Sequence, residues 1–178
     1  MSRIVASVTT LEQHIKAIKE TPEIYLPPSC PHCGIKIIWR HGCYTRKADR
    51  KPAGDGLLNP VPILRFCCSG CRRTCSRLPQ CIAPRRWHNW SVQQGVLGRL
   101  LNGCSLHHCA QCCGLDRRTL GRWWHWLEER HQTFSFHLRA RLPELGRAAG
   151  RAVFWSQVFD SLGLAAAMAL LDQEIIVP

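Results

Sequence analysis

The stretch 106-LHHCAQCCGLDRRTLGRWWH-125 decides the fold. A small residue, Ala110, lies where two helices would cross, because a bulky side chain there would push them apart. Gly114 follows four residues later and supplies a turn conformation that other residues adopt only under strain. Apolar residues then recur where they would hold a second helix against the first, at Leu115, Leu120 and Trp123. This spacing predicts a helix-turn-helix.

The predicted second helix has one apolar and one basic face. Its apolar stripe recurs at helical spacing and comprises Leu120, Trp123, Trp124 and Leu127. Gly121 leaves the centre of the other face flat, and around it lie Arg117, Arg118, Arg122 and His125. Such a face suits the major groove of DNA, where arginine reaches guanine edges and phosphates. The same spacing also permits an ordinary helical hairpin with a solvated basic face.

Charge is concentrated in the same part of the chain. The 178 residues suffice for one ordinary domain or two or three small ones, and the formal net charge is +12. Residues 30 to 125 hold 16 Lys and Arg against 3 Asp and Glu, whereas both flanks are nearly neutral. One contiguous basic module of this kind predicts a nucleic-acid partner.

The sequence carries 12 cysteines. The amino terminus, MSRIVASVTTLEQHIKAIKE, has no apolar run typical of a signal peptide, and the longest apolar segment, residues 162–171, is too short to span a membrane. We therefore expect a soluble, cytoplasmic, nucleoid-associated protein with no membrane partner. In a reducing compartment, metal binding or burial accounts for cysteines better than disulfides do.

Two C-x-x-C pairs predict a zinc ribbon. Cys30 and Cys33 precede Gly34, which lets the backbone turn beneath a bound ion, and a second pair follows at Cys68 and Cys71. Each pair adjoins a predicted strand, at 35–39 and at 61–66, and the polar segment 46–60 forms the tip of the hairpin. We expect the four thiolates to hold a structural Zn²⁺ ion in tetrahedral geometry.

Several other residues are alternative metal ligands. Cys67 and Cys75 flank the second pair, and His32 or His41 could in principle replace a thiolate, although we assign the site to Cys68 and Cys71. A separate metal site among Cys104, Cys109, Cys112 and Cys113 is disfavoured. Cys109 and Cys113 occupy apolar positions of the helix-turn-helix, where a small hydrophobic residue is expected.

The predicted fold class is mainly α with a small β zinc ribbon, whose hairpin precedes a three-helix helix-turn-helix and carboxy-terminal helices. The first 24 residues hold a short helix ending near Glu20, with a Thr10–Gln13 capping box and an apolar stripe of Leu11, Ile15 and Ile18. The ribbon occupies residues 25–86.

The helix-turn-helix domain occupies residues 87–142. Its supporting helix spans Ser91 to Asn102, capped by Ser91 with Gln94 and stopped by Gly103, and its last helix continues to Pro143. Residues 143–178 form the carboxy-terminal segment, with one amphipathic stretch from Arg147 to Asp172. That stretch would close the core or form a contact in a homodimer.

Basic residues outside the second helix predict phosphate contacts. Any one of them is as well explained by a solvated surface, but the cluster favours DNA backbone contact. It comprises Arg46, Lys47, Arg50, Lys51, Arg65, Arg72, Arg73, Arg77, Arg85 and Arg86.

Four motifs together resemble a known family. CPHCG, WRHGCYTR, VPILRFCCSGCRRTCSRLP and NGCSLHHCAQCCGLDRRTLGRWW occur in this order over roughly residues 25–130. This region resembles the amino-terminal zinc-ribbon and helix-turn-helix region of bacterial insertion-sequence transposases, and the small transposon-associated proteins that carry only that region. Cys75 is a departure, since such proteins usually have an aromatic residue there. The resemblance implies structural zinc and sequence-specific binding to the inverted repeats at an element's ends.

We expect no catalytic centre in this chain. A transposase of the acidic-triad type needs three carboxylates on a ribonuclease-H-like sheet. Beyond residue 130, fewer than 50 residues remain, with no strand pattern, and their only acidic residues are Glu144, Asp160, Asp172 and Glu174. The sequence is compatible with a stand-alone binding protein, a repressor of its own element, or the front part of a split transposase whose catalytic subunit is a partner.

Three alternative functions stay open. An adaptor would use the same fold to dock a transposase or polymerase subunit. Thiol redox chemistry would use Cys109 and Cys112, although no thioredoxin-like pattern surrounds them. RNA binding is compatible with the charge, whereas helix-turn-helix spacing favours duplex DNA.

Overall fold

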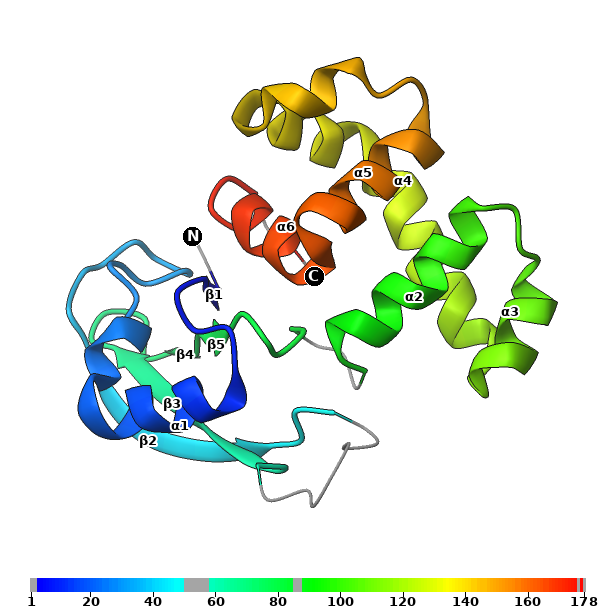
Figure 1. Cartoon of the computed structure of the whole chain (residues 1–178). Coiled ribbons are helices and arrows are strands. Elements are labelled where there is room, and N and C mark those ends of the chain that lie inside the picture. The colour runs from blue at the N-terminus through cyan, green and yellow to red at the C-terminus, as the bar shows by residue number, and fades with distance from the viewer. Residues whose placement is uncertain (1–2, 50–57, 85–87, 176, 178) are drawn as a thin grey trace. The chain divides into compact units, whose positions relative to one another are not determined.

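The computed structural model describes residues 3–49, 58–84, 88–175 and 177 (Figure 1). These residues form a mostly helical chain with small sheets, in agreement with the mainly α class. The sequence suggested four segments, whereas the chain divides into two compact units. Unit 1 comprises residues 1–89 with 172–178, and unit 2 comprises residues 90–171.

Unit 1 is built on a three-stranded sheet in the order β2-β3-β4. Strands β2 (Ile38–Arg46) and β3 (Val61–Cys68) are antiparallel, as a hairpin requires, and β4 (Thr74–Cys75) pairs with the other edge of β3. The prediction for residues 61–66 is confirmed. The strand predicted at 35–39 begins later, at Ile38, because the backbone of Ile35 and Ile37 bonds to the two cysteine turns instead of to a strand.

Helix α1 (Leu11–Glu20) packs against β3, and its predicted capping box between Thr10 and Gln13 is confirmed. Ala17 packs in a cluster with Leu64 and Phe66. The predicted stripe of Leu11, Ile15 and Ile18 is half-buried, because α1 places another side of the helix deepest in the core.

His14 is the fully buried polar residue of α1. Its Nε2 lies 2.8 Å from the carbonyl oxygen of Pro62, which can only accept, so Nε2–H donates there. Nδ1 then accepts from the hydroxyl of Tyr25 at 2.6 Å. Burial lowers the pKa of His14, although the bond to Pro62 acts in the opposite direction, and the ring is therefore neutral. Through its two bonds the ring joins α1, the 3₁₀ turn η1 (Pro22–Tyr25) and β3.

A second, parallel pair of short strands joins the two ends of unit 1. Strand β1 (Ile4–Val5) pairs with β5 (Leu78–Pro79). The buried carboxylate of Asp172 accepts from the backbone N–H of Ile4 at 2.7 Å and from that of Arg3. These bonds hold Asp172, which follows α6, in unit 1.

Unit 2 consists of helices. They are α2 (Trp90–Leu101), α3 (Leu106–Cys113), α4 (Arg117–Arg141), the 3₁₀ turn η2 (Pro143–Arg147), α5 (Arg151–Ser161) and α6 (Gly163–Leu171). As predicted, α2 ends just before Gly103 and α4 ends before Pro143. Ser91 is not a cap, since α2 already includes Trp90. Gln94 instead accepts from the backbone N–H of Leu164 at 2.6 Å and joins α2 to α6.

The predicted single stretch from Arg147 to Asp172 is broken into two helices. Gly163 has a φ of 76° and begins a new helix direction, so α5 and α6 are bent by 102°. No single helix in the described part of the chain is long and apolar enough to cross a membrane. Only α5 and α6 taken together have the required length and hydropathy, and they are bent relative to each other.

An aromatic cluster forms the core of unit 2. The ring of Trp155 is fully buried and lies 6.2 Å from that of Phe134 and 5.4 Å from that of Phe154. Trp155 also donates its indole N–H to His131 at 3.2 Å. The predicted stripe of α4 is buried at Leu120, Trp123 and Leu127, while Trp124 is half-buried beneath the guanidinium of Arg151, 4.9 Å away.

Candidate metal centre and basic helix

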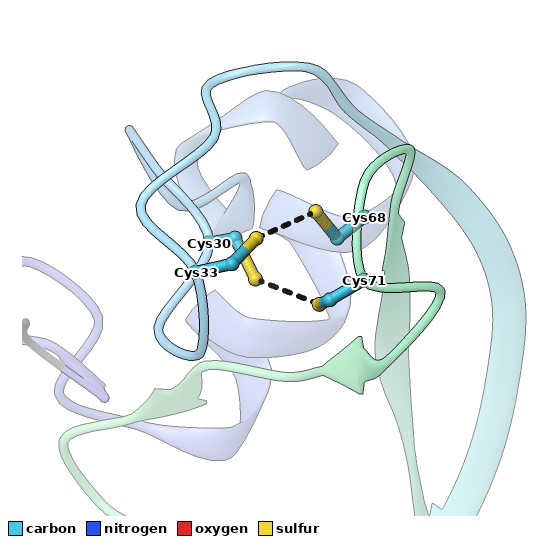
Figure 2. Close-up of side chains that lie close together, drawn as sticks. All are labelled: Cys30, Cys33, Cys68 and Cys71. Atoms are coloured by element: carbon cyan, nitrogen blue, oxygen red, sulfur yellow. Dashed lines mark hydrogen bonds between the residues drawn. The ribbon is translucent and has the colours of Figure 1, made fainter.

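Four cysteine sulfurs converge in unit 1 (Figure 2). The Sγ atoms of Cys30 and Cys71 are 3.6 Å apart, those of Cys33 and Cys68 are 3.5 Å apart, and all four lie within 4.8 Å of one another. A tetrahedral ion with sulfur ligands at about 2.3 Å requires sulfurs about 3.8 Å from each other. The predicted pairs are therefore brought together at a spacing that could hold a metal ion.

The two C-x-x-C turns are built alike. In each turn, the residue after the second cysteine adopts a left-handed conformation, with a φ of 77° at Gly34 and 60° at Arg72. The N–H of Gly34 bonds to the carbonyl of Cys30 and that of Arg72 to the carbonyl of Cys68. The sequence identified Gly34 for this role, whereas Arg72 performs it as a non-glycine residue under strain.

A backbone hydrogen bond connects the second turn to the segment that follows the first turn. The N–H of Ser69 donates to the carbonyl of Ile37 at 3.0 Å, and within the first turn the N–H of Cys30 donates to Ile35 at 2.8 Å. These bonds fix the segment between Cys33 and β2. The four thiols therefore project from a framework whose backbone positions are set by the fold.

The thiols of this cluster differ in their readiness to ionise. Burial opposes ionisation of Cys30, but hydrogen bonds from the backbone and from neighbouring thiols outweigh it and lower its pKa to about 6. An Arg73 backbone bond favours the thiolate of Cys71, yet burial and the neighbouring thiols raise its pKa to about 12. Four thiolates this close repel one another, and a divalent cation would offset the repulsion.

The structure selects one set among the alternative ligands. Cys67 lies on β3 with its thiol near backbone carbonyls, and Cys75 is half-buried on β4. Among the described residues, the four-cysteine cluster is the one group in which three or more potential metal ligands lie close enough to share an ion. His32 and His41 are not part of it. Cys104, Cys109, Cys112 and Cys113 form no such group there, and Cys109 is buried against α2, as expected for a small apolar residue.

A tight turn connects α3 to α4 in unit 2. Gly114 has a φ of 61° and caps α3, its N–H bonding back to Ala110 and Gln111. Asp116 caps the start of α4, where its carboxylate accepts from the N–H groups of Arg118 at 2.8 Å and Thr119 at 3.2 Å. The role predicted for Gly114 is confirmed, and the capping role of Asp116 is new.

The predicted basic face of α4 is exposed. Arg117, Arg118, Arg122 and His125 are all exposed, in the first turns of the helix. Arg122 donates to the hydroxyl of Thr119 at 3.3 Å, and His125 lies 3.0 Å from the carboxylate of Glu129. Open space surrounds Gly121, so nothing protrudes between these side chains at that position.

The basic residues of unit 1 fall into distinct environments. Lys47, Arg72 and Arg73 are exposed. Arg46 is half-buried and donates to the carbonyl of Ala83 at 2.6 Å, while Arg77 donates to the carbonyls of Ile24 and Ile4. Arg65 covers the ring of Tyr44 at 5.2 Å. The remaining predicted contacts lie outside the described residues: Arg50, Lys51, Arg85 and Arg86.

Comparisons with protein-family models, with curated proteins and with solved structures found no match to this chain.

Proposed function

We propose that this chain is a zinc-stabilised, sequence-specific DNA-binding protein of a mobile element, without a catalytic centre of its own. In this proposal, Zn²⁺ bound by Cys30, Cys33, Cys68 and Cys71 is structural. The first turns of α4 enter the major groove, and exposed basic residues of unit 1 contact phosphates. The DNA would be the inverted repeats at the element's ends, and a transposase catalytic subunit or a second copy of the chain would be a partner.

The chemistry of the four-cysteine cluster supports zinc. Two C-x-x-C turns supply four sulfur ligands and no oxygen, and sulfur ligands in tetrahedral arrangement favour Zn²⁺ over Mg²⁺ or Ca²⁺. Four cysteine ligands would fill every position of a tetrahedral site, which is typical of structural zinc sites. Catalytic zinc sites keep one position open for water.

The observation that carries the DNA proposal is the division of α4 into two faces. Leu120, Trp123 and Leu127 are fully or nearly fully buried, whereas Arg117, Arg118 and Arg122 are exposed on the other side. The turn at Gly114 and the cap at Asp116 fix where this basic face begins. A short helix, a tight turn and a second helix with exposed arginines in its first turns match the way that helix-turn-helix proteins present side chains to bases.

The roles of the exposed arginines are separable by experiment. We expect Arg118→Ala to weaken binding to a specific duplex by about tenfold or more, and to weaken binding to a random duplex less, because base contacts carry the preference. Arg130→Ala is the matched control, since it removes the same charge from an exposed position further along α4. Arg73→Ala in unit 1 should weaken both duplexes alike and flatten the salt dependence.

Fluorescence anisotropy with labelled duplexes measures all three variants. The proposal for α4 fails if Arg118→Ala and Arg130→Ala change the affinity for specific and random duplexes by the same factor. Zinc content and the thermal midpoint of unfolding, measured on each variant, exclude misfolding as the cause.

One observation favours an adaptor as the second candidate. Apolar side chains beside the first cysteine turn are exposed, with Ile37 at 70%, Ile35 at 40% and Trp39 at 39%. Exposed apolar residues grouped in this way are typical of protein-interaction surfaces. An adaptor predicts weak, sequence-independent DNA binding together with a stable complex that Ile37→Ser disrupts.

A further inference from the structure

A pocket of about 400 Å³ in unit 1 lies beside the cysteine turns, and its lining includes none of the four clustered cysteines. Its polar wall includes Arg3, His32, Arg46, Thr74 and Ser76. Tyr44, Cys75, Leu78 and two prolines, Pro31 and Pro84, form the rest of the wall. No lining residue in the described part of the chain is acidic. We propose that this pocket binds one unpaired nucleotide of the nucleic acid, with the phosphate toward Arg3 and Arg46 and the base against Tyr44.

The charge of the pocket favours an anion. Arg46 donates to the carbonyl of Ala83 at 2.6 Å and to the side chain of Tyr44, and these bonds hold the guanidinium at the pocket. The backbone of Arg3 is fixed by Asp172 and by a 2.8 Å bond from the N–H of Leu78 to its carbonyl. The side chains of Arg3 and Arg46, which come from different segments, and the hydroxyls of Thr74 and Ser76 provide donors for phosphate oxygens.

The size and the apolar wall favour a nucleotide over a phosphate alone. The volume is in the range of pockets that hold small organic molecules, about 300–1,000 Å³, and is larger than one phosphate needs. Tyr44 offers an aromatic ring. The guanidinium carbon of Arg65, which is not a lining residue, lies 5.2 Å from the centroid of that ring. Stacking of a base on an aromatic ring, next to arginine, is a common way to bind unpaired nucleotides.

Access to the pocket is compatible with this ligand. Arg3, Tyr44, Arg46 and Ser76 are half-buried, and Thr74 is exposed, so the pocket opens to solvent. This inference rests on the proposed function in one respect, namely that the nucleotide belongs to the DNA that the protein binds. Duplex recognition is assigned to α4 in unit 2, and the pocket is built entirely from unit 1.

Calorimetry on the full, zinc-loaded chain tests the pocket with three probes: dTMP, thymidine and inorganic phosphate. We expect dTMP to bind at least about tenfold more tightly than either part alone. Arg3→Gln, which keeps the backbone bonds of residue 3, should weaken dTMP binding about tenfold. Arg40→Gln, an exposed arginine of β2 outside the pocket, should leave it unchanged.

A second arm distinguishes a free nucleotide from an unpaired nucleotide of DNA. A duplex with one unpaired 3′ nucleotide should bind more tightly than the blunt duplex, and Arg3→Gln or Thr74→Val should abolish that difference. If dTMP binds and the unpaired nucleotide gives no gain in affinity, the DNA source is wrong. If dTMP does not bind at millimolar concentration, or if Arg3→Gln and Arg40→Gln weaken it equally, the pocket proposal is overturned.

The failure of this inference differs from failure of the proposed function. Arg118→Ala should reduce duplex binding and leave dTMP binding unchanged, because Arg118 belongs to unit 2. Loss of dTMP binding in a protein that still prefers its specific duplex contradicts the pocket alone. Equal binding of specific and random duplexes contradicts the role of α4 alone.

Discussion

The two units of this protein bury their apolar residues in different ways. Unit 2 concentrates large side chains, with Phe134 and Phe154 fully buried and each packed against the fully buried Trp155. Unit 1 divides its core into two small clusters, one around Leu64 and Phe66 and the other around Val61 and Ile63. Small cores rarely stabilise a fold alone. A metal ion held by the four-cysteine cluster would stabilise unit 1 as the aromatic core stabilises unit 2.

Removal of one ligand should have the largest effect and should be confined to unit 1. We expect Cys33→Ser to abolish stoichiometric zinc binding and the protection of unit 1 amides, because structural zinc contributes on the order of 10 kcal/mol to such folds. Cys43→Ser is the matched control, since Cys43 is also exposed but is outside the cluster. Hydrogen exchange on the full chain reports on both units, and equal loss of protection in unit 2 would contradict an effect confined to unit 1.

Truncation of the aromatic core should act on unit 2. Phe134→Ala is expected to lower the free energy of unfolding of unit 2 by about 3–5 kcal/mol, through lost burial and a cavity next to Trp155. Phe136→Ala removes the same side chain from an exposed position two residues away and should cost less than about 0.5 kcal/mol. Denaturant titration followed by tryptophan fluorescence measures both, and similar costs would show that the cluster is not the core.

A substitution at Gly121 should separate stability from binding. The space around Gly121 is open, so Gly121→Glu replaces a poor helix former without a clash and should stabilise α4 by about 0.5–1 kcal/mol. The same carboxylate lies among the exposed arginines and should reduce DNA affinity at least tenfold. Thermal unfolding and anisotropy on one preparation test this, and unchanged affinity would remove this face from the DNA interface.

The smallest expected effect concerns the two cysteine turns. Arg72 holds a left-handed conformation that Gly34 holds in the other turn, so Arg72→Gly should raise the stability of unit 1 by up to about 1 kcal/mol. Gly34→Arg should lower it by a similar amount. Denaturant titration of the zinc-loaded variants measures both changes in the free energy of unfolding. Destabilisation by Arg72→Gly would mean that the arginine side chain has a structural role of its own.

Local patterns in the sequence were sufficient for several elements. The C-x-x-C pairs, the Thr10–Gln13 capping box, Gly114 and the apolar spacing of α4 each act within a few residues, and the structure has each of them where it was expected. Because these interactions join residues close in sequence, they can be predicted from the sequence alone. The choice of Cys68 and Cys71 over Cys67 and Cys75 belongs to the same class.

Features that depend on distant residues were not predictable. Asp172 bonds to the backbone of Ile4 across 168 positions, and no local pattern relates the two. His14 reads as a polar helix residue, and only the placement of Tyr25 and Pro62 explains its burial. The later start of β2 has the same origin, because Ile37 bonds to Ser69 in the second cysteine turn, far away in sequence.

The pocket in unit 1 is a further example. Arg3, Tyr44 and Ser76 come from three separate segments, and sequence analysis assigned none of them to a site. Arg46 was predicted as a surface phosphate contact, and its bond to Ala83 shows that it also has a structural role.

Binding of the zinc-loaded protein to duplexes from the ends of its own genetic element, against scrambled duplexes, tests the central claim most directly. Anisotropy at low and near-physiological salt gives both affinities. The account predicts a preference of roughly a thousandfold or more for the element ends that persists at the higher salt. Equal affinity for both duplexes, lost together as salt is raised, would contradict it and would favour the adaptor.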